Sequence, residues 1–190
     1  MHNETIQVIP PTDYSALATI VAEYLTGTEN ILEIAKKCPG TTVGYYLGSE
    51  LIGTAYGFPS EFDDGFSLDG IVVVEPYNAA GRGGKLLAFF EQQVAALGYS
   101  EISLGSADGY VERFYLKNGY RATELKILVP RGISWENHPA FPVAEVQTQG
   151  EYTKLVLRVD DYFAMDKDAL TCHYHGEDSF FIFVKELQQP

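Results

Sequence analysis

The sequence predicts an α/β fold, because strand and helix patterns alternate along most of its 190 residues. The run LDGIVVVEP is apolar enough to form a strand that is covered on both faces. An amphipathic helix pattern follows over residues 81–97, and the next segments repeat the order strand, helix, strand. Hydrophobic residues make up 46% of the chain, which is enough for a sizeable core.

The N-terminal part predicts one strand, two helices and a hairpin. Pro10 and Pro11 precede the first helix, which Thr12 or Asp13 can cap, and Gly48 lies at the hairpin turn. The expected elements are a strand at 5–8, helices at 14–25 and 29–37, and hairpin strands within 41–58.

The remainder of the chain continues this alternation and then interrupts it. Residues 130–150 are irregular and contain prolines, so we expect a core at 1–132 and a C-terminal extension at 133–190. The expected core elements are a strand at 68–76, a helix at 81–97, a strand at 99–106, a helix at 108–119 and a strand at 120–129. The extension predicts a strand at 152–159, a helix at 160–170 capped by Asp160 or Asp161, and a strand at 179–187.

The acidic composition limits the partners of the protein. A net charge of -13 argues against nucleic acid and anionic membranes, which both require a basic surface. No apolar run is long enough to cross a bilayer, and MHNETIQVIPP lacks the pattern of a secretory signal, so we expect a cytoplasmic protein. The stretch from Arg82 to Arg131 differs, because its seven basic and five acidic residues give it a net charge of +2.

The cysteines and histidines do not predict a metal site. Cys38 and Cys172 are expected to be small core residues. The segment TCHYHGED places His173 and His175 on one side of an extended segment, yet a second ligand pair with recognised spacing is missing. We therefore expect a polar turn there and no metal.

A glycine-rich bend at residues 81–84 predicts an anion-binding site. The first N–H groups of a helix lack partners inside the helix, and the helix dipole favours negative charge beside them. Gly81, Gly83 and Gly84 allow phosphate oxygens to approach the backbone closely, while Arg82 and Lys85 add positive charge.

Two common nucleotide motifs do not fit this spacing. A P-loop requires glycine at the position of Ala79 and serine or threonine at the position of Leu86. A dinucleotide fingerprint starting at Gly81 requires glycine or alanine at position 86. We therefore expect neither ATP nor NAD to bind.

The bend resembles the acetyl-CoA loop of the GNAT N-acetyltransferase superfamily, written Arg/Gln-x-x-Gly-x-Gly/Ala. NAAGRG at residues 78–83 matches both glycines and lies between an apolar strand and a helix, although Asn78 replaces the usual Arg or Gln. A second family motif is matched within DGYVERFYLKNGY by Phe114, Tyr115, Gly119 and Tyr120. In that motif Asp108 and Val111 replace the family's Asn and Ala.

The resemblance covers roughly residues 5–130. It implies a mixed, mostly antiparallel central sheet flanked by helices, followed here by a strand-helix-strand extension. It also implies acetyl-CoA as co-substrate, without a metal, with its pantetheine arm paired to the backbone of Ile71 and Val73 or, in the other register, Val72 and Val74. The expected cofactor-binding residues are Ile71, Val73, Asn78, Ala79, Ala80, Gly81, Arg82, Gly83, Gly84, Asp108 and Tyr115.

The resemblance further implies an acyltransferase that passes the acetyl group directly to an amine. Tyr115 would protonate the departing thiolate, as the family's Tyr at this motif position often does; its ring could instead pack in the core. Asp69 lies on the same side as Ile71 and Val73 if the strand alternates regularly, so it could accept the amine proton or simply be a solvated acid.

The acceptor is expected to be a small, cationic primary amine. Glu61, Asp63, Asp64 and Asp69 lie in and after the loop that should border the acceptor, where negative charge attracts an ammonium group. The extension could complete the sheet, cover the acceptor site or form a homodimer contact.

A second hypothesis is a catalytically degenerate module that binds or senses acyl-CoA. Asn78 and Asp108 motivate it, because a shorter uncharged side chain and a carboxylate replace two groups that contact the cofactor in the family.

Overall fold

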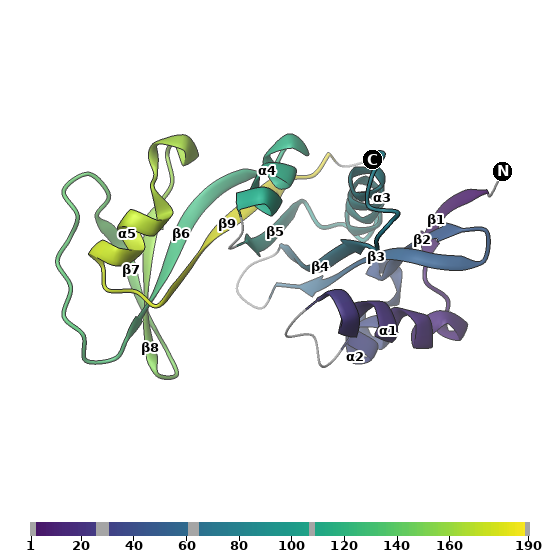
Figure 1. Ribbon diagram of the computed structural model, residues 1–190, viewed down its shortest axis with the longest axis horizontal. Helices are drawn as coiled ribbons and strands as arrows, with labels where there is room; N and C mark the ends of the chain where they lie inside the picture. Colours follow the sequence, from purple (N-terminus) through teal and green to yellow (C-terminus); the bar gives the residue numbers. More distant parts are fainter. Residues whose placement is uncertain (1–2, 26–30, 61–64, 107–108, 189–190) are drawn as a thin grey trace. The chain divides into compact units, whose positions relative to one another are not determined.

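The structure, a computed structural model, describes residues 3–25, 31–60, 65–106 and 109–188 (Figure 1). The chain forms two compact units, the first made of residues 1–102 and 186–190 and the second of residues 103–185. The expected boundary at residue 132 thus falls inside the second unit. The last part of the chain returns to the first unit, where the Leu187 N–H donates to the Ser100 carbonyl at 2.7 Å.

The first unit is built on four antiparallel strands in the order β1-β2-β3-β4. Its elements are β1 (Glu4–Val8), α1 (Tyr14–Tyr24), α2 (Ile31–Lys37), β2 (Val43–Leu47), β3 (Glu50–Pro59), β4 (Phe66–Val73) and α3 (Arg82–Ala96), with 3₁₀ turns η1 (Pro11–Asp13) and η2 (Pro39–Thr41). Helices α1 and α2 cover one face of these strands and α3 covers the other (Figure 1).

Each face of the first sheet has its own apolar core. Tyr56 of β3 is fully buried against residues of α1 and α2, including Leu17 and Val21. On the opposite face Phe66 of β4 packs edge-on against Phe90 of α3, with ring centroids 6.0 Å apart. Burial on both faces explains why this part of the sequence reads as continuous apolar runs.

The second unit contains five strands in the order β5-β9-β6-β8-β7. Its elements are β5 (Glu101–Ser106), which begins in the first unit, α4 (Gly109–Lys117), β6 (Arg121–Pro130), β7 (Val143–Gln149), β8 (Tyr152–Arg158), η3 (Tyr162–Ala164), α5 (Lys167–His173) and β9 (Asp178–Glu186). Strands β8 and β9 flank β6 in antiparallel pairs. The extension therefore completes this sheet, which is one of the three roles that the sequence left open.

The two faces of the second sheet differ in burial. One face is fully buried, and Tyr115 of α4 and Tyr162 of η3 cover part of it by contacting Phe183 and Phe181. Its buried residues are Leu125, Ile127, Val129, Leu155, Leu157, Phe181 and Phe183. The alternate positions of β6 and β9, such as Lys126 and Phe180, are only half-buried.

Two expectations for the extension were wrong. Strand β7 lies in the segment that we expected to be irregular; its residues are mostly exposed, so pairing with β8 rather than local alternation of apolar residues holds it. The single helix expected at 160–170 is instead η3, where Asp161 caps the turn, and α5, where Asp166 accepts from the Ala169 N–H at 3.0 Å. Because α5 runs to His173, that histidine lies on a helix rather than on an extended segment.

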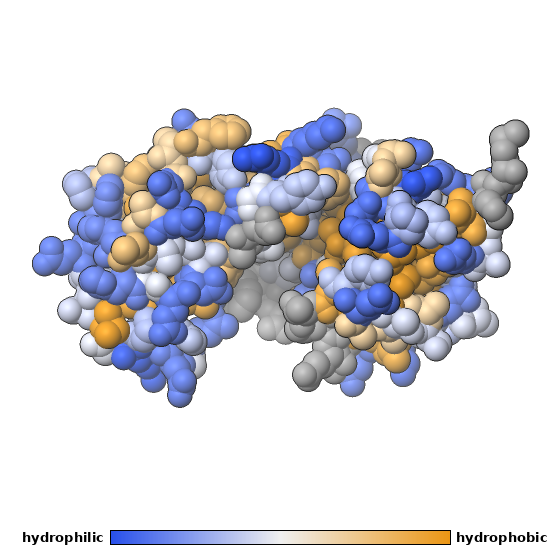
Figure 2. Space-filling model, in the orientation of Figure 1, coloured by the Kyte–Doolittle hydropathy of each residue, from blue (hydrophilic) through white to orange (hydrophobic). Residues whose placement is uncertain are grey.

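Hydrophilic side chains spread over the face shown in Figure 2, and hydrophobic residues lie between them in smaller groups. Within the described ranges, no helix has both the length and the apolar character that a membrane crossing requires.

Candidate functional site in the first unit

The glycine-rich bend joins the end of β4 to the start of α3. Ala80 and Gly81 both have left-handed backbone conformations, with φ of 61° and 73°. Gly81 is the N-cap of α3, and its carbonyl accepts the first helical hydrogen bond from the Lys85 N–H at 3.2 Å. A Cβ atom at Gly81 would have no neighbour within 4 Å among the described residues, so this point of the backbone faces open space.

No side chain of the described residues caps α3 at Gly81. Residues 82–84 precede the first helical hydrogen bond, and N–H groups at these positions of a helix need a partner from outside it. Residues 78–81 are exposed and residues 82–84 are half-buried. The bend therefore offers backbone donors and the positive end of the helix dipole to an anion.

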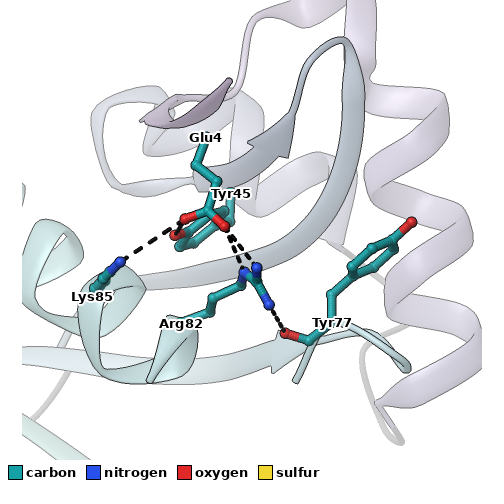
Figure 3. Close-up of polar contacts among 5 residues, drawn as sticks. All are labelled: Glu4, Tyr45, Tyr77, Arg82 and Lys85. Atoms are coloured by element: carbon teal, nitrogen blue, oxygen red, sulfur yellow. Dashed lines mark hydrogen bonds and ion pairs between the residues drawn. The ribbon is translucent and has the colours of Figure 1, made fainter. Parts of the chain in front are cut away.

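The Arg82 side chain does not extend into the solvent but is held inside the first unit. Its Nη2 and Nε atoms donate to Glu4 Oε1 at 2.6 and 3.1 Å, and its Nη1 atom donates to the Tyr77 carbonyl at 3.1 Å (Figure 3). Tyr45 Oη donates to the other Glu4 oxygen at 2.7 Å, and Lys85 Nζ lies 3.9 Å from it. Arg82 thus connects strand β1 to the loop that leads into the bend.

The charges in this network support one another. Hydrogen bonds from Tyr45 and Arg82 lower the pKa of Glu4, and the Glu4 carboxylate raises the pKa of Arg82. Tyr45 has a raised pKa, first because it is buried and then because it donates to Glu4. Each group is consequently held in its usual neutral-pH form: Glu4 negative, Arg82 positive and Tyr45 protonated.

Strand β4 contains a β-bulge at Asp69. Gly70 pairs with Tyr56 while Leu68 pairs with Gly57, which leaves Asp69 as the extra residue. The regular alternation that would place Asp69 on the side of Ile71 and Val73 is therefore interrupted at Asp69 itself, so the placement of its side chain stays a prediction. Although the Asp69 side chain is exposed, the protein atoms around its carboxyl group raise its pKa by partial desolvation.

Ile71 and Val73 lie in the regular part of β4 beyond the bulge. They pair with Ala55 and Gly53 of β3, and both are half-buried. Cross-strand partners share a face, and the bulge reverses which positions of β4 face α3. Ile71 and Val73 therefore lie on the same face as Phe66 and Leu68, although their sequence parity differs.

Tyr115 lies in the second unit, and its surroundings are aromatic. Its ring contacts Phe114 and Tyr120 edge-on, at centroid distances of 5.3 and 5.5 Å. Burial raises the pKa of Tyr115 to about 12, and 6% of the residue remains accessible to solvent. The phenol is thus fully protonated at neutral pH.

Comparison with solved structures identifies this arrangement of strands, helices and bend. Ard1 from Thermoplasma volcanium matches 97% of this chain and 98% of its own, with 16% identity and a TM-score of 0.61. N-acetylglutamate synthase from Neisseria gonorrhoeae, in complex with coenzyme A and N-acetyl-glutamate, matches 99% of this chain and 36% of its own, with 12% identity and a TM-score of 0.59. Arabidopsis thaliana Naa50, in complex with the bisubstrate analogue CoA-Ac-MVNAL, matches 81% and 97%, with 15% identity and a TM-score of 0.54.

The chain has the GNAT acetyltransferase fold. Neither a protein-family model nor a curated protein sequence matches it. The GNAT fold therefore emerges from the three-dimensional arrangement, and at these identities the likeness establishes the fold alone.

Within the GNAT fold, the structure brings most of the expected site residues together in the first unit. Those from β4, the bend and the start of α3 are Asp69, Ile71, Val73, Asn78, Ala79, Ala80, Gly81, Arg82, Gly83 and Gly84. Tyr115 belongs to the second unit. Asp108, like Glu61, Asp63 and Asp64, lies outside the described residues.

The sequence did not reveal three members of the Arg82 network, namely Glu4, Tyr45 and Tyr77. Glu4 is 78 positions away from Arg82, so no local pattern could link them. Asn78, expected at the pyrophosphate, is exposed, and its Nδ2 atom lies 3.5 Å from Glu75 Oε1.

Proposed function

We propose that the protein is an N-acetyltransferase that transfers an acetyl group from acetyl-CoA to the primary amine of a small, cationic acceptor. The observation that carries this proposal is the uncapped N-terminus of α3, presented by a left-handed bend after β4 in a chain with the GNAT fold. Coenzyme A is present in the matched Neisseria synthase structure, which supports the same ligand here.

In this proposal the backbone binds the pyrophosphate of the cofactor. The N–H groups of Arg82, Gly83 and Gly84 donate to its oxygens, and exposed Lys85 adds positive charge nearby. Ala79, Ala80 and Gly81 shape the approach, while Asn78 contributes a neutral amide. The Arg82 guanidinium acts indirectly, because its contacts with Glu4 and the Tyr77 carbonyl fix the loop that presents these donors.

The pantetheine arm would pair with the backbone of Ile71 and Val73. Both residues lie beyond the bulge, in the regular part of β4, where an added extended segment can find evenly spaced donors and acceptors. The bulge at Asp69 would mark the end of this regular stretch.

Acetyl transfer requires the amine nitrogen to attack the thioester carbon while the carbon–sulfur bond breaks. Asp69 would accept a proton from the amine, directly or through water, and its raised pKa makes it a stronger base than an ordinary aspartate. Tyr115 would stabilise the departing thiolate. With a pKa of about 12 it is a weaker acid than a thiol of pKa about 8.5, so hydrogen bonding to the thiolate is favoured over full proton transfer.

The proposed cationic acceptor depends on Asp69, whose carboxylate would lie near the amine and which is within the described residues. The matched structures contain both a small product, N-acetyl-glutamate, and a peptide-like analogue, CoA-Ac-MVNAL, so peptide N-termini belong in the test. A cytoplasmic location and a homodimer remain part of the proposal.

The competing function is a module that binds acyl-CoA without turnover. Burial of Tyr115 in an aromatic cluster favours it, because a ring packed in this way can be purely structural.

Two measurements separate these functions. Calorimetry with coenzyme A tests the bend, and release of free thiol from acetyl-CoA tests turnover across polyamines, aminoglycosides, amino acids and peptide N-termini. We expect saturable coenzyme A binding and thiol release with at least one amine. Binding without release on any acceptor would support the module, and absence of binding would reject both functions.

A further inference from the structure

The half-buried face of the second sheet carries a group of cations that the proposed acetyl transfer does not use. Register places this group on one face: Glu124 pairs with Arg158, Lys126 with Val156 and Leu128 with Lys154. Positions that differ by two along a strand share a face, so Lys126 and Lys154 are diagonal neighbours across β6 and β8.

Two of the three cations on this face contact a carboxylate. Glu124 accepts from Arg158 Nη1 at 2.7 Å and lies 3.5 Å from Lys126 Nζ, so one carboxylate serves two cations. Lys154 adds a third positive charge. Glu145, across from Val156, and Asp178, across from Leu128, share this face, so the six side chains sum to zero, but no ion pair joins either carboxylate to Lys154 among the described residues.

Lys154 differs from the other half-buried lysines of the second unit. Lys126 lies beside Glu124, Lys167 donates to Glu112 at 3.1 Å, and Lys185 donates to the Asn118 carbonyl at 2.9 Å. Within residues 103–106 and 109–185, Lys154 has neither an ion pair nor a hydrogen bond from its ammonium group. Desolvation, and then the neighbouring charge of Lys126, lowers its pKa.

The other groups around Lys154 complete an amphipathic surface. Gln147 of β7 pairs with Lys154 and lies on the same face, although its amide donates to exposed Glu145 at 2.9 Å. Half-buried Phe180 of β9 lies across from Lys126, and Leu128 lies across from Lys154. Apolar side chains thus border the cations, whereas Asp178 at the start of β9 is exposed and accepts from the Ser179 N–H.

We propose that Lys126 and Lys154 form a binding site for a small oxyanion, either a carboxylate or a phosphate group, on this face of the second sheet. A partly desolvated ammonium beside a like charge is unfavourable, and an anion that bridges the two lysines relieves both effects. Leu128 and Phe180 would contact the apolar part of a ligand whose anionic group binds the lysines. The site is independent of the proposed acetyl transfer, so either can fail without the other.

The test is titration of the full chain with inorganic phosphate and, separately, with succinate at constant ionic strength. Lys154→Met keeps the apolar stem and removes the charge, and we expect it to weaken binding of the preferred anion about tenfold. Lys154→Arg keeps a cation and should retain most of the affinity. Exposed Lys117 provides the matched control, because Lys117→Met removes one positive charge from the same unit and should leave binding unchanged.

A second readout follows the lysines directly. Nuclear magnetic resonance of the lysine side chains should show that saturating anion raises the pKa of Lys154, whereas the resonances of the Lys117 side chain should not move. A preference between phosphate and succinate would identify the oxyanion. Equal affinity in the wild type and Lys154→Met, or no saturable binding of either anion, would overturn the proposal.

Discussion

Arg82 in the first unit and Lys154 in the second are both partly buried cations, yet their surroundings differ. Arg82 has three donors engaged by Glu4 and the Tyr77 carbonyl, and its pKa is raised. Lys154 has no such partner among the described residues of its unit, and its pKa is lowered. A satisfied cation is typical of a structural role, whereas an unsatisfied one suggests that the missing anion comes from solution.

In the proposed enzyme the bend binds the cofactor and Tyr115 takes part in the chemistry. The first unit provides backbone donors held by a satisfied network, and the second provides Tyr115 within an aromatic cluster. Variants of the bend and of Tyr115 should therefore change different quantities.

Tyr115→Phe should have the largest effect, with kcat about 100-fold lower and coenzyme A affinity nearly unchanged. The phenol hydroxyl would act only on the thiolate that forms during the reaction, while the ring packing is preserved. Steady-state kinetics and calorimetry measure the two quantities. An unaltered kcat would remove Tyr115 from the mechanism and leave it a packing residue.

Asp69→Asn should lower kcat/KM about 30-fold and also change its pH dependence. A base must be deprotonated to act, so wild-type activity should fall as pH falls through the raised pKa of Asp69. This fall should begin at a higher pH than for an ordinary aspartate and should disappear in the variant. If both proteins give the same pH profile, Asp69 is not the base.

Gly81→Ala should weaken coenzyme A binding about tenfold, because a methyl group would enter the space where the phosphate approaches the bend. Gly48→Ala is its matched control. Gly48 has a similar φ of 65° and equally open surroundings, but it lies in the β2–β3 hairpin. Both variants should lose about 1 kcal/mol of folding free energy, and only Gly81→Ala should affect binding. Equal affinity in both would place the pyrophosphate elsewhere.

The smallest effects should appear in the pH dependence of the free energy of unfolding. A carboxylate causes the effect in the first unit, and a lysine causes it in the second. The lowered pKa of Glu4 adds stability at pH values above the unfolded-state pKa of this carboxyl group. This stability is lost as pH falls through the folded-state pKa. Glu4→Gln should lack that acidic loss. The lowered pKa of Lys154 means that the unfolded chain holds its proton more tightly, so stability should rise with pH between the folded and unfolded values.

Lys154→Met should lack this alkaline rise. Urea unfolding of the wild type and both variants across pH measures the two contributions. Identical curves for wild type and Glu4→Gln would show that the Arg82 network does not stabilise the first unit, and an alkaline rise that persists in Lys154→Met must come from another group.

The sequence predicted the bend and its flanking elements because their signals are local. An apolar strand, glycines and an amphipathic helix occur within residues 68–97. The partner of Arg82 could not be predicted, because β1 reaches the bend only after the sheet has formed. The bulge at Asp69 was missed for a related reason: an extra residue in a strand is defined by its pairing with β3, and no residue type within the strand marks it.

The second unit was harder to predict. Strand β7 has a polar sequence and depends on β8, and the position of β9 beside β6 brings together residues fifty or more positions apart. The charges of Lys126 and Lys154 were visible in the sequence, but only the strand register shows that they are neighbours.

The interior position of β9 has a consequence for how the chain matures. Strand β9 lies between β5 and β6, yet it follows every other strand of the second unit in the chain. A nascent polypeptide that has emerged only as far as residue 177 carries β5 and β6 with two unfilled edges, which invite pairing with other molecules. Ribosome-bound chains halted there should attract chaperones, and release of nine more residues should end that dependence.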